Sequence, residues 1–274
     1  MSMHQALAEP RILVVANQKG GVGKTTTAIN LGTALAAVGE RVLIIDTDPQ
    51  GNASTGLGIP HEDGTPSTFH VLMGELGLGE VIQESAIPGL HCAPATMDLL
   101  GAELELATLE RRAFRMKDAI AQYYRSTPTP DRAYSYILLD CPPSLNLLTM
   151  NAMAAADAVL VPLQCEFYAL EGLSQLMKTV DQVRGTLNPS LSIQGVVLTM
   201  FDTRNSLSRQ VAQDVRSVLG NQVYETVIPR NVRVSEAPSH GKPVLLYDNE
   251  CAGSQAYIRL ASEMIKRERR LRAA

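Results

Sequence analysis

Continuous apolar runs alternate with longer, mixed segments along almost the whole chain. The runs at 42–45, 137–139 and 158–161 read Val-Leu-Ile-Ile, Ile-Leu-Leu and Ala-Val-Leu-Val, with no polar residue at alternate positions. Strands of this kind are typical of a parallel sheet whose two faces are both covered. We predict strands at 11–16, 41–46, 89–93, 135–140, 158–163, 193–199 and 223–228.

Helical segments occupy most of the chain between these runs. We predict helices at 25–38, 98–124, 146–155, 169–187, 206–219 and 252–270. This alternation predicts an α/β fold, a doubly wound, mostly parallel sheet with helices on both faces and ligands at the carboxyl ends of its strands. The stretch at 126–130 is predicted to be a loop, and no repeat or linker divides the chain. We therefore predict one domain at 11–265, between an N-terminal tail at 1–10 and a basic C-terminal tail at 266–274.

Composition narrows the class of protein. The 274 residues are 45% apolar, which is ordinary for a globular protein with a substantial core. No stretch reaches the roughly 18 consecutive apolar residues that a membrane helix needs, and the polar start of the chain lacks the apolar core of a signal peptide. Cys92, Cys141, Cys165 and Cys251 are scattered, so we expect buried free thiols in a reducing cytoplasm. The net charge of −4 argues against attraction of DNA or lipid over the whole surface, but it permits a local basic face.

The strongest chemical signal lies between the first predicted strand and the first predicted helix. Residues 19–26 read Lys-Gly-Gly-Val-Gly-Lys-Thr-Thr. Three glycines allow the backbone to turn its N–H groups toward an anion, and the N-terminus of the following helix adds its dipole. Lys24 can reach the outer phosphates of a nucleotide, and Thr25 places a hydroxyl where Mg²⁺ would bind. The loop therefore predicts a P-loop site for nucleotide phosphates.

One position departs from the plain P-loop pattern. That pattern has a glycine five places before the last loop glycine, where this chain has Gln18, and an extra lysine, Lys19, opens the loop. The extra lysine is the signature of the deviant Walker A ATPases, which this loop resembles.

Carboxylates follow two other predicted strands. Asp46 and Asp48 come at and just after the end of one strand, and Asp140 ends another. A carboxylate beside a P-loop can orient the attacking water or a metal-bound water. We predict that Asp48 orients the water and that Asp46 supports the metal shell. Apolar residues followed by Asp140 form a Walker B element, so Thr25, Asp48 and Asp140 are the predicted metal-site residues.

Five longer segments extend these motifs. They read KGGVGKTTTAINLG at 19–32, DTDPQGN at 46–52, DCPPSLNLLT at 140–149, QCEFYALEGL at 164–173 and VIPRNVRVSEAPSHGKP at 227–243. Together they resemble ParA/Soj, the partition ATPases that segregate chromosomes and plasmids. The resemblance runs through nearly the whole chain. Larger plasmid ParA proteins carry a DNA-binding extension before the P-loop, for which the first ten residues leave no room, so we expect the short, chromosomal type.

The resemblance implies a mechanism with ATP and Mg²⁺. Lys24 and the backbone of the loop hold the phosphates, Thr25 binds Mg²⁺, and Asp48 positions the water. Lys19 reaches across a homodimer, so that two ATP molecules are sandwiched between two subunits. No NKxD motif for guanine is present, so ATP is expected rather than GTP. The residues assigned to ATP are Lys19, Gly20, Gly21, Val22, Gly23, Lys24, Thr25, Thr26, Pro229 and Asn231, and those assigned to catalysis are Asp48, Lys24 and Lys19.

The resemblance also implies that the dimer binds double-stranded DNA without sequence preference, and that a ParB-type partner protein releases it by stimulating slow hydrolysis. Such DNA binding depends mainly on neutralisation of phosphates by Lys and Arg. Arg204 and Arg233 match the family positions that make this contact. The residues that could extend the patch are Arg209, Arg216, Arg230 and Lys242. For the basic segment at 266–272 we expect a frayed, solvated helix end, and we expect the protein in the cytoplasm, on the nucleoid, without stable membrane association.

Other functions share some of these features. A MinD-like membrane ATPase would need an amphipathic C-terminal helix, whereas Leu271 alone is a bulky apolar residue beyond position 266. A relative of the nitrogenase iron protein would need two cysteines that bridge a cluster across a dimer, and only Cys141 is suggestively placed. A nucleotide-gated scaffold with negligible turnover, or a partition-type ATPase for a cargo other than DNA, would carry the same motifs.

Overall fold

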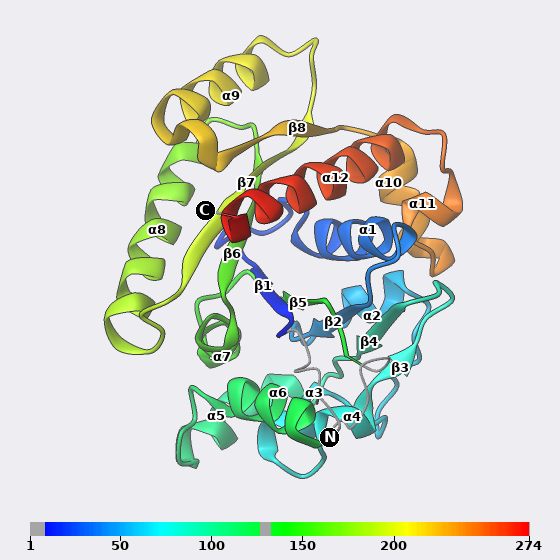
Figure 1. Cartoon of the computed structure of the whole chain (residues 1–274), viewed down its shortest axis with the longest axis vertical. Helices are drawn as coiled ribbons and strands as arrows, with labels where there is room; N and C mark the ends of the chain where they lie inside the picture. Colours follow the sequence, from blue (N-terminus) through cyan, green and yellow to red (C-terminus); the bar gives the residue numbers. More distant parts are fainter. Residues whose placement is uncertain (1–8, 127–132, 274) are drawn as a thin grey trace.

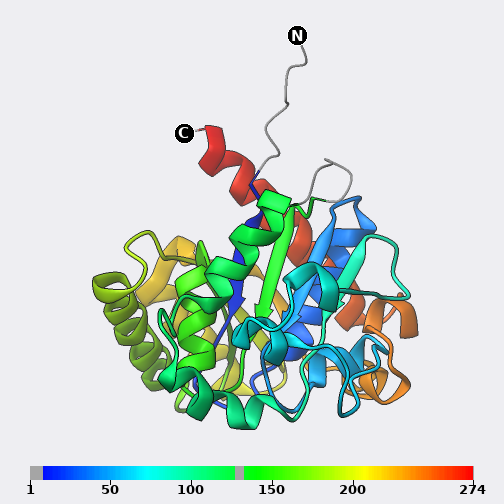
Figure 2. The same cartoon turned by 90° about the horizontal axis from the view of Figure 1, so that it is seen from below.

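One eight-stranded sheet lies between two layers of helices in the part of the chain that the structure describes (Figure 1 and Figure 2). The structure is a computed structural model and describes residues 9–126 and 133–273. The strand order is β3-β4-β2-β5-β1-β6-β7-β8, and each neighbouring pair is parallel except β3–β4. The strands are β1 (Arg11–Val15), β2 (Val42–Asp46), β3 (Gln83–Glu84), β4 (Leu90–Ala93), β5 (Tyr136–Asp140), β6 (Ala158–Gln164), β7 (Ser192–Phe201) and β8 (Val223–Pro229).

The sheet buries apolar side chains on both faces. Successive strand residues point to opposite sides, so Leu13 and Ile44 enter one core while Val14 and Ile45 enter the other. The first core is covered by α1 (Lys24–Ala37), α2 (Asn52–Gly56), α10 (Val232–Glu236), the 3₁₀ turn η3 (Ala237–His240), α11 (Val244–Tyr247) and α12 (Ala252–Ala273). The second is covered by α3 (Thr68–Met73), α4 (Leu78–Val81), α5 (Leu99–Thr108), α6 (Arg115–Ser126), α7 (Leu147–Ala155), α8 (Ala169–Thr186) and α9 (Ser206–Leu219), and the turn η2 (Gly220–Gln222) leads into β8.

The predicted α/β class and all seven predicted strands are confirmed, with ends that agree within two residues. The sequence pattern missed β3 because its two residues form only a short antiparallel edge. The prediction of one helix at 98–124 is wrong. The chain turns between α5 and α6, where Leu109 is extended and Arg111 adopts a left-handed φ of 53°. Arg111 forms a 2.8 Å ion pair with Asp118 that stabilises this turn. The turn contains no glycine or proline, so the sequence pattern does not indicate it.

The end of α12 also differs from expectation. Instead of fraying at residue 266, the helix continues, and Glu268 is only 5% exposed. Tyr136 on β5 donates a hydrogen bond of 2.7 Å to the Glu268 carboxylate, and the Arg11 guanidinium lies 3.4 Å from it. Buried charges need such partners, which here anchor the helix on the sheet. The described helices include none that is both long and apolar enough to span a membrane. Most of the predicted N-terminal tail and of the loop at 126–130 lies outside the described residues.

Candidate nucleotide-binding site

The glycine-rich loop connects β1 to α1 at the carboxyl edge of the sheet. Gly21 and Gly23 have φ values of 72° and 86°, a left-handed conformation that residues with a Cβ atom rarely adopt. Gly23 is the N-cap of α1, and no side chain caps this helix start. A Cβ atom built on Gly20 or Gly21 would meet no atom within 4 Å. The loop thus leaves open space on its outer side and free N–H groups at the positive end of a 14-residue helix, which is the arrangement that binds phosphate.

Two neighbouring strands hold the loop in place. The Thr199 hydroxyl at the end of β7 donates a 2.8 Å hydrogen bond to the carbonyl of Val22. The Asn17 side-chain amide donates to the carbonyl of Pro162 on β6, and its oxygen accepts from the N–H of Lys19. Thr199 has no role in the sequence prediction, because its position beside the loop follows only from the pairing of β6 with β7.

Lys24 occupies the first position of α1, and only 7% of its surface is exposed. Its ammonium group donates to the carbonyl of Lys19 at 3.1 Å, across the loop. Burial lowers the pKa of Lys24, whereas the charges of Asp140 and Asp48 act in the opposite direction. The predicted phosphate lysine therefore lies inside the loop, close to the predicted metal-site carboxylates.

The strand ends bring the acidic residues to the same edge. Asp140 is directly opposite Val15 of β1 and Asp46 of β2 in the sheet register. It is fully buried, and neither of its carboxylate oxygens has a hydrogen-bond partner among the residues that the structure describes. Burial and the nearby Asp46 raise the pKa of Asp140, and Thr25 is close enough to lower it. A buried carboxylate without partners is costly, so this site fits a cation or its bound water, with Thr25 as the neighbouring hydroxyl.

Asp46 forms hydrogen bonds that the sequence did not predict. One of its carboxylate oxygens accepts hydrogen bonds from the N–H of Ser54 at 3.0 Å and from the Ser54 hydroxyl at 2.8 Å. Its other oxygen accepts from the N–H of Asp48 at 3.2 Å. Burial raises the pKa of Asp46 to about 6, although these hydrogen bonds favour the ionised form. Asp46 therefore shapes the turn that carries Asp48, and its support of the metal shell stays a prediction.

Asp48, the predicted water-orienting residue, is half-buried and faces the same charges. Its Oδ1 atom accepts a 3.0 Å hydrogen bond from the N–H of Gln50. Asp48 contributes to the pKa values of both Lys24 and Asp140, which places all three side chains within electrostatic reach of one another. The structure thus groups the loop, Lys24, Asp48 and Asp140.

The signature lysine forms a contact that the sequence does not announce. The ammonium group of Lys19 lies 2.6 Å from a carboxylate oxygen of Glu166, which follows β6. The two side chains are 39% and 47% exposed. In the isolated subunit, Lys19 is therefore paired with a carboxylate of its own chain rather than directed outward. Glu166 belongs to one of the family-like segments, but no residue pattern indicated this contact.

Pro229 and Asn231 lie at and just after the end of β8, which pairs with β7. Pro229 ends β8 opposite Phe201 of β7, two residues after Thr199. Asn231 caps α10 by accepting a hydrogen bond from the N–H of Arg233. Met200 on β7 has a left-handed φ of 49°, and its methyl group lies 3.8 Å from a Cβ built on Gly23. These two residues assigned to ATP therefore lie at the end of β8, beside the strand whose Thr199 contacts the loop.

The predicted DNA-binding arginines are both neutralised by neighbours. Arg204 is 89% exposed, but it forms a 3.1 Å ion pair with Asp202. Arg233 pairs with Glu236 at 3.0 Å and with Asp248 at 3.5 Å. These contacts place both guanidinium groups at the surface but leave little net positive charge at either position.

A parallel sheet whose first strand leads through such a loop into a helix with a buried lysine defines a P-loop nucleotide-binding protein. Residues 10–193 match the family described as AAA domain. The chain is 64% identical over 259 residues to the chromosome partitioning protein ParA of Caulobacter vibrioides strain NA1000 / CB15N, covering 94% of this chain and 95% of the relative. It is 49% identical to the sporulation initiation inhibitor protein Soj of Bacillus subtilis strain 168, covering 93% and 98%.

Solved structures agree with this class. A cobyrinic acid a,c-diamide synthase from Mycobacterium smegmatis, with bound ATP analog and magnesium, matches with a TM-score of 0.80 at 35% identity over 95% of this chain and 96% of that one. The septum site-determining protein MinD from Pyrococcus horikoshii, complexed with Mg-ADP, matches with a TM-score of 0.74 at 26% identity over 93% and 95%. The chain belongs to the AAA-domain family and, within it, to the ParA/Soj P-loop ATPases. The predicted family is thereby confirmed.

Proposed function

We propose that this chain is a partition ATPase that moves a chromosome or plasmid. ATP closes two subunits into a dimer, the dimer binds DNA without sequence preference, and ATP hydrolysis stimulated by a ParB-type partner releases it. The ParA and Soj relatives support the partitioning role. The observation that supports ATPase activity is the fully buried Asp140, whose two oxygens accept no hydrogen bond of regular geometry from the described residues, on the strand beside a P-loop with a buried Lys24.

Each residue of the site has a defined task in this proposal. The N–H groups of residues 20–26 and the Lys24 ammonium bind the phosphates. Thr25, Asp140 and Asp48 would hold Mg²⁺, and the ion when bound would neutralise charge on the phosphates. Asp48 orients the attacking water and accepts its hydrogen bond. Asp46 keeps Asp48 in place through its hydrogen bonds to the backbone of Asp48 and Ser54.

Dimerisation follows from the same geometry. The open outer side of Gly20 and Gly21 provides room for a second backbone to approach. Lys19 would leave Glu166 and pair with the nucleotide of the partner subunit, because triphosphate oxygens carry more negative charge than one half-exposed carboxylate. ATP then links the two subunits, and loss of the outer phosphate weakens the link.

Binding to a non-specific duplex under different nucleotide states tests the proposal. Fluorescence anisotropy of a labelled duplex should show tight binding with ATP and weak binding with ADP or without nucleotide. Addition of a cognate ParB-type protein should accelerate both phosphate release and dissociation from DNA. Equal binding in all nucleotide states would contradict the proposal. Retention of another macromolecular cargo, without DNA binding, would favour the alternative of a partition-type ATPase that positions a cargo other than DNA.

A further inference from the structure

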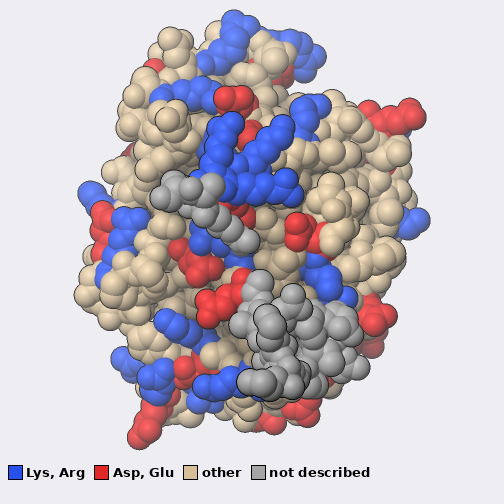
Figure 3. Space-filling view, in the orientation of Figure 1, with Lys and Arg blue, Asp and Glu red and all other residues tan. Residues whose placement is uncertain are grey.

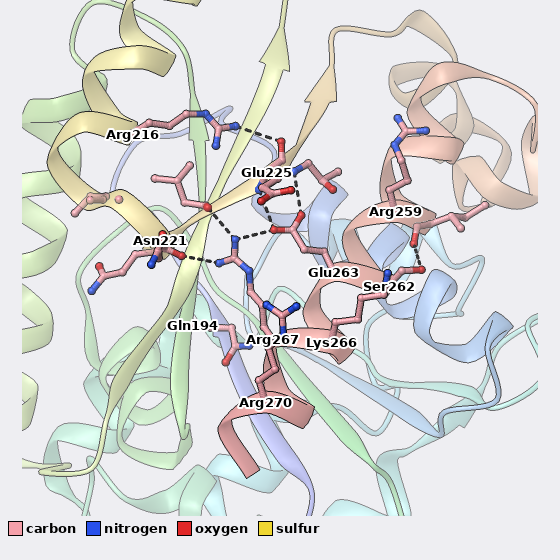
Figure 4. A pocket seen from close by; sticks show the side chains of 16 residues that line it. Gln194, Arg216, Asn221, Glu225, Arg259, Ser262, Glu263, Lys266, Arg267 and Arg270 are labelled. Carbon is pink, nitrogen blue, oxygen red and sulfur yellow. Dashed lines mark hydrogen bonds and ion pairs between the residues drawn. The ribbon is translucent and has the colours of Figure 1, made fainter. Parts of the chain in front are cut away.

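A broad groove lies between α12 and the edge of the sheet at η2 and β8, far along the chain from the P-loop. Its volume is about 1200 Å³. Figure 4 shows the side chains that line it. Although the whole chain carries a net charge of −4, the lining contains five cationic side chains and only two carboxylates. The cations are Arg216, Arg259, Lys266, Arg267 and Arg270. The groove therefore reverses the overall charge of the protein locally.

Part of this charge is committed to the fold. Arg267 donates hydrogen bonds to the carbonyls of Asn221 and Val223 and pairs with Glu263 at 2.7 Å. Its guanidinium carbon lies 4.1 Å from the centre of the Tyr224 ring. Glu263 also accepts hydrogen bonds from two backbone N–H groups of β8. The charges of Arg267 and Glu263 thus compensate each other, and both side chains bind the backbone of β8.

Three of the remaining cations form a row on α12. Arg259, Lys266 and Arg270 are exposed, and among the described residues none of them has an acidic group within ion-pair distance. Their spacing of seven and four residues places them on one helical face. At a rise of 1.5 Å per residue the row is about 16 Å long, which matches about five nucleotides along one DNA strand. Arg204 and Arg233, by contrast, are paired with carboxylates of their own chain.

The row is continuous with the predicted DNA surface. Arg259 also lines a second hollow of about 540 Å³, whose other lining residues include Arg204, Pro229 and Arg230. Figure 3 shows Lys and Arg side chains gathered over the middle of this face of the molecule. A groove with several free cations in line suits an extended polyanion better than a single phosphate group. A lipid surface would require bulky apolar side chains on the same helix, and residues 252–270 of α12 include no exposed large apolar side chain.

We propose that the α12 groove, defined by Arg216, Arg259, Lys266 and Arg270, binds the phosphate backbone of duplex DNA as an extension of the surface at Arg204. This inference rests on the proposed DNA-binding function and locates free positive charge for it. Each subunit of a dimer presents one groove, so DNA affinity depends on two rows of cations. Contacts to phosphates carry no base information, so the groove adds affinity without sequence preference.

The test removes two groove cations and compares them with two cations elsewhere. Lys266→Gln with Arg270→Gln neutralises exposed side chains that form no hydrogen bond within the described structure, so folding should be unaffected. The matched control is Lys117→Gln with Arg125→Gln, which removes the same two charge types from exposed positions on α6, beneath the other face of the sheet. Both variants and the parent protein are titrated with a labelled duplex in ATP and Mg²⁺ over a salt series. Dimerisation with ATP is measured by light scattering.

We expect the groove variant to dimerise like the parent and to bind DNA at least about tenfold more weakly. Its slope of log affinity against log salt should fall by about 2 to 4 units, because the dimer loses four phosphate contacts. The control variant should behave like the parent. An unchanged slope in the groove variant, or an equal loss in the control, overturns the groove assignment. Loss of binding to anionic lipid vesicles with DNA binding intact also overturns it, whereas a parent protein that binds no DNA with ATP refutes the proposed function itself.

Discussion

The nucleotide site and the cationic surface are built in opposite ways, although both serve phosphate groups in the proposed function. At the nucleotide site, buried residues at adjacent strand ends face one another, and the carboxylate oxygens of Asp140 accept no hydrogen bond of regular geometry from the described residues. At the cationic surface, exposed arginines find carboxylates on their own segments, as Arg204 does with Asp202. The buried site therefore leaves the charge of Asp140 available for a ligand. On the surface, a carboxylate of the same segment largely compensates the charge of Arg204. Arg259, Lys266 and Arg270 on α12, by contrast, form no ion pair with any described residue.

The largest effect is expected where burial is greatest. Lys24→Ala removes the buried ammonium group that faces the phosphates, so ATP binding should weaken by about 100-fold or more. Isothermal titration calorimetry measures this change, and Lys117→Ala on the surface of α6 is the control. Tight ATP binding by the Lys24 variant would contradict the assignment of the loop as the phosphate-binding site.

Asp48→Asn should separate binding from hydrolysis. The amide oxygen can keep the hydrogen bond from Gln50, but it lacks the charge that orients water. Hydrolysis should fall by about 100-fold or more while ATP binding and dimerisation persist, so the variant stays on DNA. Single-turnover phosphate release measures the rate, with the exposed Asp63→Asn as control. Turnover at the parent rate would move the catalytic role to another residue.

Gly20→Val should separate ATP binding from dimerisation. A Cβ atom at Gly20 meets nothing within 4 Å in the single subunit, so the monomer should fold and bind ATP. In the dimer, the same side chain would stand where two backbones approach. Light scattering with ATP should show a monomer, and Gly185→Val, at an equally open position on α8, should dimerise normally. An ATP-bound dimer of the Gly20 variant contradicts the sandwich geometry.

Arg204→Ala and Arg233→Ala should each weaken DNA binding without affecting dimerisation. Each change removes two phosphate contacts per dimer, so the salt slope should fall by about 1 to 2 units, equally on AT-rich and GC-rich duplexes. Asp202→Ala removes the carboxylate that pairs with Arg204, so this variant should bind DNA more tightly. Anisotropy over a salt series measures all three. Weaker binding by the Asp202 variant would show that the ion pair positions Arg204 for DNA.

The smallest effect is expected at the Lys19–Glu166 pair. Glu166→Gln removes the charge that holds Lys19 in its own subunit, so the ATP-bound dimer should form about two- to fivefold more tightly. The pair is half-exposed, which limits its strength. Sedimentation velocity over a concentration series measures the dimer dissociation constant. A weaker dimer would instead assign Glu166 to the interface.

Most of the sheet was predictable because its strands are apolar on both faces, and such runs are hard to place anywhere but in a covered parallel sheet. The turn between α5 and α6 was not predictable. It is stabilised by an ion pair between Arg111 and Asp118 and contains no glycine or proline that would mark it in the sequence. The hydrogen bonds of Asp46 were not predictable for a related reason. Ser54 lies eight residues further along the chain, and only the folded structure brings its N–H and hydroxyl groups to the Asp46 carboxylate.

The sequence by itself determined the α/β class, the P-loop and the residues Lys24, Asp48 and Asp140, because these features depend on local spacing and on strand ends that meet at one edge. Tertiary structure decided which charges are free. Thr199 reaches the loop, Glu166 holds Lys19, and Glu268 anchors α12 only because segments distant in sequence pack together. Whether a surface charge is compensated depends on neighbours from other elements, and residue order along the chain does not specify those neighbours.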